Sequence, residues 1–547
     1  MSSEVFKFRK NDRIGAAGAE EDGEFLSSCF VDTGDLHLLQ DLSDHRQIVL
    51  GRTGTGKSAL LTKLRESKPE YVIEISPENL ALTYVSNSTI LNFFSNLGVN
   101  LDPFFKLLWR HVLTIEVLSR CFEHTCKDRQ KSLLDRLSSM FMGGSRHDKE
   151  MKEAVEYLKE WGKSFWLETE FRVKEITQKL ENELGAALSA QLGPSAASIG
   201  SSSQSIERLS QEQKSELHSR AQQIVSAAQV QDLHKVINLL DTVLQDKQKK
   251  YYIVIDGLDE NWVEERIRYR LIMALILTAR DFIRVSNAKV IVAIRRDLIE
   301  RVFRLTRESG FQEEKFQSLY LPLVWKKADL IELLDRRIDA LVSRRYTKQK
   351  VTHRDLLPKQ YNSKPISEFI IEIADRPRDV ISFFNSCISA ATNLARLRVS
   401  ELRMAEGEYS RSRLRALGDE WSADYPCLLD FAAILYRRPG SFKIATIEDR
   451  DINELCLRIS AEDPGGQGLL QKHAMKLVDC AISAHDFRIF LIQVFYQVGL
   501  IGLKITPHET AAWVNELGKR VSAAEISDET SAVVHPAFHR ALGIRSN

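Results

Sequence analysis

The chain has 547 residues, with 76 Lys and Arg against 75 Asp and Glu, which gives a formal net charge of +1. Its hydrophobic content of 44% and charged content of 28% are those of a globular protein and exclude a collagen-like, purely coiled-coil or wholly disordered chain. The balanced charge excludes a uniformly basic nucleic-acid coat, and the length predicts several domains.

Features of the whole chain bear on its location in the cell. The first residues, MSSEVFKFRKNDRIG, have no apolar stretch after their charges and do not resemble a signal peptide. The longest apolar runs are too short to span a bilayer. The seven cysteines are scattered and form no CxxC pair, which favours reduced thiols. We therefore expect a cytoplasmic protein that does not associate with membranes.

In chain order, residues 1–45 are polar, and we expect them to pack on the core that follows. The apolar run RQIVL then leads into GRTGTGKSALLTKLRE, which predicts a strand, a glycine-rich turn and a helix. Further strands are predicted at YVIEIS, YYIVID, KVIVAIR and SLYLPLV. Residues 92–245 predict a large helical insertion, including a linker-like stretch at 193–205. After Lys326 the pattern is helical with breaks, followed by a compact C-terminal region. The fold class is therefore α/β, with a parallel sheet at its core.

One motif points to a phosphate. The pattern G-x-x-x-x-G-K-[ST] is matched at every position by Gly51, Arg52, Thr53, Gly54, Thr55, Gly56, Lys57 and Ser58. Glycines let such a loop wrap around a phosphate, Lys57 brings a positive charge to the β- and γ-phosphates, and the Ser58 hydroxyl ligates Mg²⁺. The following helix adds its positive N-terminal end. We expect all eight residues to bind the nucleotide.

An acidic motif follows the strand YYIVI. Asp256 is expected to contact the magnesium ion or its water, and Asp259 or Glu260 to orient and polarise the attacking water. The alternative is that Asp259 and Glu260 only cap a helix beginning near Asn261. Trp262 is expected to pack in the core.

Three arginines are candidate sensors of the nucleotide. Arg295 ends the strand KVIVAIR, which places it near the γ-phosphate; the alternative is a surface arginine in a salt bridge. Arg376 and Arg378 flank a proline at a helix start, from which they would reach a phosphate, or simply face solvent. The absence of an Asn-Lys-x-Asp motif favours ATP over GTP. His535 and His539 have no cysteine or carboxylate nearby, so we expect them to pack the C-terminus.

The DGLDE form of the acidic motif, the arginine-ending strand and the later RPRD resemble the STAND class of P-loop ATPases and the related KAP and AAA-like groups. The chain also resembles a family of bacterial P-loop ATPases through NDRIGAAGAEEDGEFL, GRTGTGKSALL, YYIVIDGLDENW and VVHPAFHRALGI. This resemblance implies an ASCE-type core over 46–325, a helical lid over 326–415 and a winged-helix-like domain over 416–547. Such proteins are commonly encoded in mobile or antiphage defence loci.

The resemblance also implies roles for individual residues. Lys57 and Ser58 match the phosphate-loop pair, Asp256 the metal acid, and Asp259 and Glu260 the water-activating acids. Arg295 matches the first sensor, and Arg378, or Arg376 beside it, the second. One departure is the long separation between Ser58 and Asp256, which requires a helical insertion that projects from the core.

We therefore expect an ATP- and Mg²⁺-dependent switch or assembly scaffold that hydrolyses ATP slowly, forms homo-oligomers and controls a separate effector protein in antiphage defence. The alternative is a nucleic-acid-binding ATPase that uses its C-terminal winged helix. Arginines near 295–307 and at 344–345 support it, but interleaved acids argue against it. Steeply salt-dependent DNA binding would favour that alternative. A third possibility is a binding module that never turns ATP over.

Overall fold

The computed structural model describes residues 6–78, 98–125, 249–306, 313–343, 350–462, 468–506, 508–514 and 521–545, with isolated positions at 95, 182, 215, 218, 219, 240, 244 and 466. Most of the insertion predicted over 92–245 lies outside these residues, as do Arg307, Arg344 and Arg345. Among the described residues, none of the helices combines the length and the apolar character needed to cross a bilayer. The chain divides into two compact units, residues 32–324 and residues 1–31 with 325–547.

The first unit is built on a five-stranded parallel sheet. Its strands stand in the order β2-β3-β4-β1-β5. They are β1 (Ile48–Gly51), β2 (Val72–Ile75), β3 (Tyr251–Ile255), β4 (Ala288–Arg295) and β5 (Tyr320–Pro322). Every residue of β1 and β3 is buried. Because parallel sheets are covered on both faces, their strands are continuous apolar runs, and the strands predicted from such runs are confirmed. The mixed α/β class is confirmed with them.

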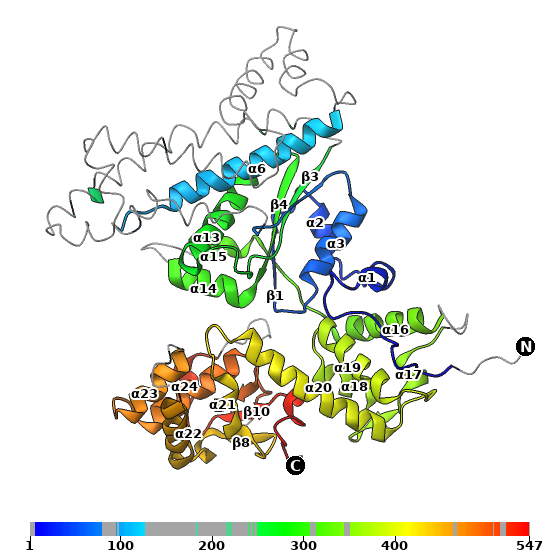
Figure 1. Ribbon diagram of the computed structural model, residues 1–547, viewed down its shortest axis with the longest axis vertical. Coiled ribbons are helices and arrows are strands. Elements are labelled where there is room, and N and C mark those ends of the chain that lie inside the picture. Colours follow the sequence, from blue (N-terminus) through cyan, green and yellow to red (C-terminus); the bar gives the residue numbers. More distant parts are fainter. Residues whose placement is uncertain are drawn as a thin grey trace, which may run out of the picture. The chain divides into compact units, whose positions relative to one another are not determined.

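Helices cover both faces of this sheet (Figure 1). On one side lie α2 (Asp35–Gln40) and α3 (Lys57–Ser67). On the other lie α6 (Asp102–Thr125), α13 (Glu265–Phe282) and α14 (Arg296–Thr306). The short α15 (Glu314–Gln317) precedes β5. The indole Nε1 of Trp109 on α6 donates to the Leu271 carbonyl oxygen on α13 at 2.9 Å, so the two helices are joined inside the core.

The second unit begins with a helical segment whose apolar faces share one core. A two-stranded hairpin of β6 (Gln360–Tyr361) and β7 (Lys364–Pro365) interrupts it. Its helices are α16 (Lys327–Ser343), α17 (His353–Leu356), α18 (Ile366–Ile373), α19 (Pro377–Ala390) and α20 (Val399–Glu420).

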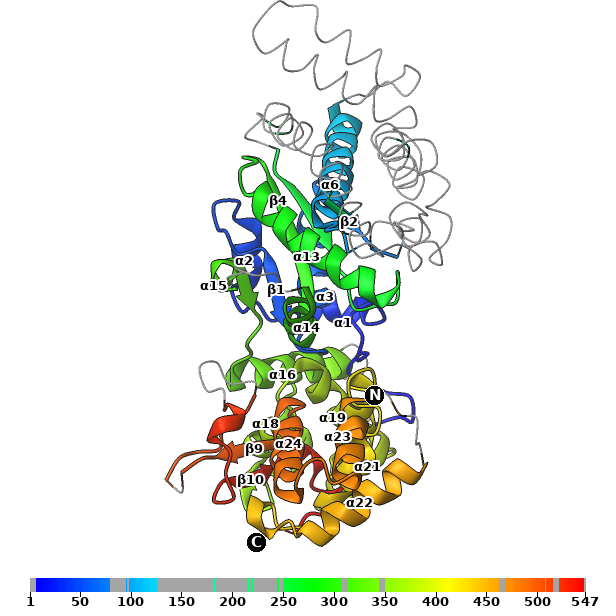
Figure 2. The same cartoon turned by 90° about the vertical axis from the view of Figure 1, so that its left-hand side faces the viewer.

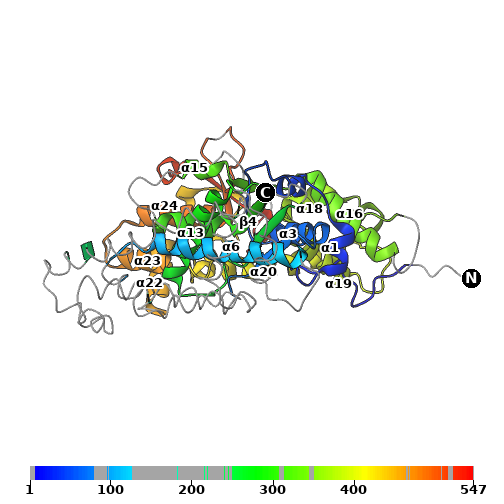
Figure 3. The same ribbon diagram turned by 90° about the horizontal axis from the view of Figure 1, so that it is seen from above.

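The N-terminal segment packs on these helices. Helix α1 (Gly23–Cys29) lies against α16 (Figure 3). The buried guanidinium of Arg337 donates to the Ile14 carbonyl oxygen at 2.9 Å and pairs with the buried Asp22. Asn385 on α19 accepts from the Ile14 amide at 3.0 Å. The sequence prediction placed residues 1–45 on the core; of these, residues 6–31 group with the helices of the second unit, whereas residues 32–45 group with the sheet unit.

The C-terminal region combines helices with a small antiparallel sheet (Figure 2). The sheet has the order β8-β10-β9, from β8 (Ser441–Lys443), β9 (Ile501–Lys504) and β10 (Ser531–Val534). The helices are α21 (Leu428–Ala432), α22 (Asp449–Glu462), α23 (Leu469–Val478) and α24 (Ala484–Gln497). The predicted winged-helix character of this region stays a prediction.

The terminal motif VVHPAFHRALGI packs against the helical segment of the same unit. Arg540 Nε donates to Glu406 on α20 at 2.8 Å, and the Tyr361 hydroxyl donates to the same carboxylate at 2.7 Å. The His539 Nε2 atom lies 3.0 Å from the Val534 carbonyl oxygen, and the His535 ring lies edge-on to that of Trp513, with 5.0 Å between centroids. These side chains hold the end of the chain in place.

Candidate functional site

The glycine-rich segment forms a tight loop between β1 and α3. Gly54 and Gly56 adopt φ angles of +80° and +94°, which residues with a Cβ rarely take. Helix α3 begins at Lys57, directly after this turn. The Lys57 ammonium lies inside the curve of the loop and donates to the carbonyl oxygens of Gly51 and Arg52 at 3.1 and 3.2 Å. The loop therefore combines a helix N-terminus and a lysine, the two features that favour an anion.

The start of the loop has no room for a side chain. A Cβ on Gly51 would lie 2.1 Å from the Thr55 hydroxyl oxygen. That hydroxyl donates to the Arg52 carbonyl oxygen at 2.8 Å, and the Thr55 amide donates to the same oxygen at 3.2 Å. Gly51 and Thr55 thus set the curvature of the loop.

The loop meets the acidic motif through Ser58 and Asp256. The Ser58 hydroxyl donates to Asp256 Oδ2 at 2.8 Å, while Asp256 Oδ1 accepts from the Gly257 amide at 2.9 Å. Strand β4 separates β1 from β3, so the two motifs are not on neighbouring strands. They meet because the carboxyl ends of parallel strands lie on the same edge of a sheet.

Burial shifts the pKa values of both charged groups here. It lowers the pKa of Lys57, against the opposing effect of the carboxylates of Asp256 and Asp259. It raises the pKa of Asp256, against the hydrogen bonds from Ser58 and the Gly257 amide. A bound divalent cation would favour the ionised form of Asp256.

The oxygen donors at this edge fit magnesium. Mg²⁺ prefers hard oxygen ligands and is commonly held by one or two carboxylates together with phosphate oxygens and water. Ser58 supplies a hydroxyl and Asp256 a carboxylate. In the part of the chain that the structure describes, no group of three or more His, Cys, Asp and Glu side chains is arranged to hold a metal ion.

Arg295 lies beside the first residue of the loop. It is the last residue of β4 and is the register partner of Gly51 on β1. Its guanidinium pairs with Asp297 at 2.7 Å and with Asp259 at 3.5 Å. The salt bridge considered as the alternative for Arg295 is present, and Arg295 stands at the sheet edge where the loop begins.

Glu260 faces a second carboxylate that the sequence reasoning missed. Burial raises the pKa of Glu260, and the charge of Glu78 and a hydrogen bond to it raise that pKa further. Glu78 follows β2, the neighbour of β3, so both acids lie beyond the same sheet edge. Glu78 lies just after a predicted strand, and this position could have marked it as a candidate site residue.

The alternative proposed for the two acids is wrong. Helix α13 begins at Glu265, and Glu264 is its N-cap, so neither Asp259 nor Glu260 caps it. Trp262 is 4% exposed, and its Nε1 donates to the Leu258 carbonyl oxygen at 3.3 Å, which places it in the core as predicted.

The other two candidate sensors belong to the second unit. Arg376 is buried and pairs with Asp379 at 2.6 Å, within a cluster that includes Arg413 and Glu420. Arg378 donates to the Ala17 carbonyl oxygen at 3.1 Å. The phosphate loop is in the first unit, so a role of either arginine at a phosphate stays a prediction.

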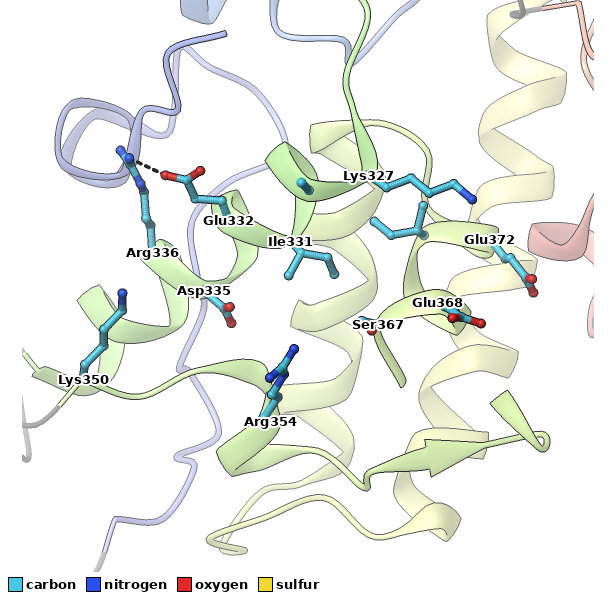
Figure 4. Close-up of a pocket in the computed structure, with 12 residues that line it drawn as sticks. Lys327, Ile331, Glu332, Asp335, Arg336, Lys350, Arg354, Ser367, Glu368 and Glu372 are labelled. Atoms are coloured by element: carbon cyan, nitrogen blue, oxygen red, sulfur yellow. Dashed lines mark hydrogen bonds and ion pairs between the residues drawn. The ribbon is translucent and has the colours of Figure 1, made fainter. Parts of the chain in front are cut away.

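The second unit contains a pocket of about 780 Å³ between α16, α17 and α18 (Figure 4). Side chains of both charges line it, and Arg336 pairs there with Glu332. Its charged lining residues are Lys327, Glu332, Asp335, Arg336, Lys350, Arg354, Glu368 and Glu372. None of the site residues predicted from the sequence lines this pocket.

Comparison with known proteins adds two findings. Residues 328–418, which include α18, α19 and most of α16 and α20, match the FunZ-associated C-terminal helical domain. The chain is also 24% identical over 435 residues to a protein of Escherichia coli (strain K12) named "Putative transposon gamma-delta 80.3 kDa protein". That similarity covers 77% of this chain and 53% of the relative, so the chain matches about half of the relative's length. The resemblance to STAND and KAP ATPases stays a prediction.

Proposed function

We propose that this chain is a P-loop ATPase that binds and slowly hydrolyses ATP and acts as a molecular switch or assembly scaffold. The hydrogen bond between Ser58 and Asp256 carries the proposal, because it joins the phosphate-loop hydroxyl to the acid of a distant strand at 2.8 Å. The interposed strand β4, which ends in Arg295, supports the ASCE type of core.

The chemistry assigns a task to each residue. The loop amides and Lys57 would hold the β- and γ-phosphates of ATP, while Ser58 and Asp256 would hold magnesium. Magnesium, when bound, neutralises charge that develops on the phosphates. The Glu260 carboxylate accepts the proton of the attacking water, and Asp259 orients that water or holds Arg295 near the γ-phosphate.

A switch requires that ATP favour one of two conformations. Arg295 is suited to report the nucleotide because its guanidinium is shared between Asp297 and the partly exposed Asp259. A γ-phosphate would compete with these carboxylates for the arginine. Arg376 or Arg378 would act as the second sensor, closing the helical segment as a lid.

Control of a separate effector protein, homo-oligomer formation and a place in bacterial antiphage defence are supported by the resemblance to ATPases of mobile and defence loci. The named relative is a transposon protein, and the domain that matches residues 328–418 is described as a helical domain associated with FunZ. ATP binding and hydrolysis at the phosphate loop do not depend on this biological role.

Phosphate release and mass by light scattering, both with and without ATP–Mg²⁺, test the proposal. Wild type should release phosphate and gain mass with ATP, whereas Glu260→Gln should stay in the heavier form with only a slow residual turnover. Glu264→Gln, an exposed N-cap residue of α13, is the matched control. Absence of turnover in wild type would overturn the proposed ATPase activity. A mass that does not change with nucleotide would overturn the proposed assembly. Hydrolysis that DNA stimulates, with binding that falls steeply with salt, would favour the nucleic-acid-binding alternative.

A further inference from the structure

The loop that carries the two acids is anchored by an arginine from the next helix. Arg268, in the second turn of α13, reaches back to the acidic loop. One of its guanidinium nitrogens, Nη1, donates to the Glu260 carbonyl oxygen at 2.8 Å and to the Asn261 side-chain oxygen at 2.7 Å. The arginine therefore holds the backbone of the residue whose carboxylate faces the proposed water.

The surroundings of Arg268 are costly for a charge. Arg268 is 7% exposed, and among the described residues it pairs with no carboxylate and its Nε has no hydrogen-bond acceptor, while its guanidinium lies over the Tyr269 ring, 5.6 Å from the centroid. Buried charges are ordinarily paired, because removing a guanidinium from water costs free energy, and hydrogen bonds to neutral acceptors compensate for only part of that cost. Hydrogen bonds from a charged donor are roughly twice as strong as neutral ones, so Arg268 holds the loop firmly. The same burial lowers the free energy of unfolding.

Other hydrogen bonds act on the same loop. Gly257 has a φ of +76° and starts a turn in which its carbonyl oxygen accepts from the Glu260 amide at 3.2 Å. Trp262 holds the Leu258 carbonyl oxygen. Arg268 adds a third hydrogen bond, to the carbonyl oxygen of Glu260 itself.

We propose that Arg268 is a positioning residue, which sets the place of the Glu260 carboxylate through the hydrogen bond to its backbone. This inference rests on the proposed function. A general base must lie within hydrogen-bond reach of the proton that it accepts, and a misplacement of about 1 Å costs on the order of 100-fold in rate. Arg268 acts on turnover and leaves ATP binding to the phosphate loop.

The test compares Arg268→Met, Arg268→Lys and the control Arg280→Met, which removes an arginine from the other end of α13, where it lies over the Phe316 ring. Arg268→Met should lower kcat about 10- to 100-fold and leave the Kd of ATP within about twofold. Arg268→Lys keeps the positive charge on a shorter side chain, so its kcat should lie between those of Arg268→Met and wild type. Arg280→Met should keep the wild-type kcat.

Combination with Glu260→Gln separates positioning from a general structural role. Because Arg268 acts through Glu260, Arg268→Met should cost nothing further in a Glu260→Gln background. A full kcat in Arg268→Met, or losses that add in the double variant, would overturn the inference. If Arg268→Met fails to fold, Arg268→Lys and Asn261→Ala take its place, and full turnover in both would overturn it.

Hydrogen exchange of the loop 257–261 without nucleotide gives a readout independent of activity. Exchange in this loop should rise in Arg268→Met and stay unchanged in Arg280→Met; unchanged exchange in Arg268→Met would overturn the anchor. If wild type hydrolyses no ATP, the proposed function fails and the catalytic part of the inference fails with it. If wild type hydrolyses ATP and Arg268→Met does so equally well, the inference alone fails.

Discussion

The hydroxyl of Ser58 donates a hydrogen bond of 2.8 Å to the carboxylate of Asp256, across 198 positions of sequence. A contact of this kind joins the residue that follows the phosphate-loop lysine to an acid at the end of another strand. Both side chains offer oxygen ligands of the kind that Mg²⁺ prefers.

Removal of either partner should therefore act on the magnesium-dependent step. Ser58→Ala should weaken binding of ATP–Mg²⁺ by about tenfold and leave binding of ATP in EDTA unchanged, because only one metal ligand is lost. Asp256→Asn should abolish phosphate release. Titration of ATP with and without Mg²⁺ checks the first prediction and a phosphate-release assay the second, with Ser67→Ala at the far end of α3 as control. Equal losses with and without the metal would contradict these roles.

The pair of Glu260 and Glu78 predicts the acidic side of the pH–rate profile. Burial and the neighbouring Glu78 raise the pKa of Glu260 above its ordinary value of 4.5. A base works only when ionised, so kcat should fall as pH falls through this raised pKa. Glu78→Gln removes a like charge and should move the midpoint of that fall to lower pH.

A pH series of kcat for wild type, Glu78→Gln and Glu74→Gln makes the comparison. Glu74 is on β2, where it is exposed and pairs with Arg65 at 2.7 Å, so its removal should leave the midpoint unchanged. A midpoint that stays fixed or rises in Glu78→Gln would show that Glu78 does not act on the base.

The terminal motif should contribute to stability rather than to turnover. Glu406 is 6% exposed and accepts hydrogen bonds from Arg540 and Tyr361. Arg540→Met leaves this buried carboxylate with one partner fewer and should lower the free energy of unfolding by about 1–3 kcal/mol. Urea unfolding followed by circular dichroism measures the change.

The matched control for Arg540→Met is Arg450→Ala, which removes an exposed pair with Glu454 and should cost about 0.5 kcal/mol or less. An Arg540→Met protein that unfolds at the wild-type urea concentration, or that loses ATP turnover while fully folded, would refute the structural role of the motif.

Local pattern was sufficient for the elements of the sheet. Short apolar runs bounded by turn residues predicted the strands at Ile48, Val72, Tyr251, Ala288 and Tyr320, because buried parallel strands are apolar on both faces. The glycine-rich spacing predicted the loop, since only glycine takes the φ angles of Gly54 and Gly56 without strain.

Contacts between residues far apart in the sequence could not be predicted from local pattern. No local signal reports that β4 lies between β1 and β3, or that the N-terminal segment binds α16 through Arg337. The apolar run FLIQVFYQVGLIGLKI also contains a boundary between a helix and a strand that its pattern does not indicate. Helix α24 ends at Gln497 and β9 begins at Ile501, with a turn at Gly499, whose φ is +79°. Nor does any local signal report that Arg268 donates to the Glu260 carbonyl oxygen.

Equilibrium binding of ATP–Mg²⁺ by isothermal titration calorimetry, on wild type and Lys57→Ala, tests the central claim most directly. Lys57 is partly buried in the loop and donates only to its carbonyl oxygens among the contacts described, whereas Lys63 on the same helix pairs with Glu66 at 3.0 Å and serves as control. The account predicts that wild type and Lys63→Ala bind ATP and that Lys57→Ala binds it about 100-fold more weakly or not at all. A wild-type protein that binds no ATP, or a Lys57→Ala protein that binds it equally well, would contradict the account.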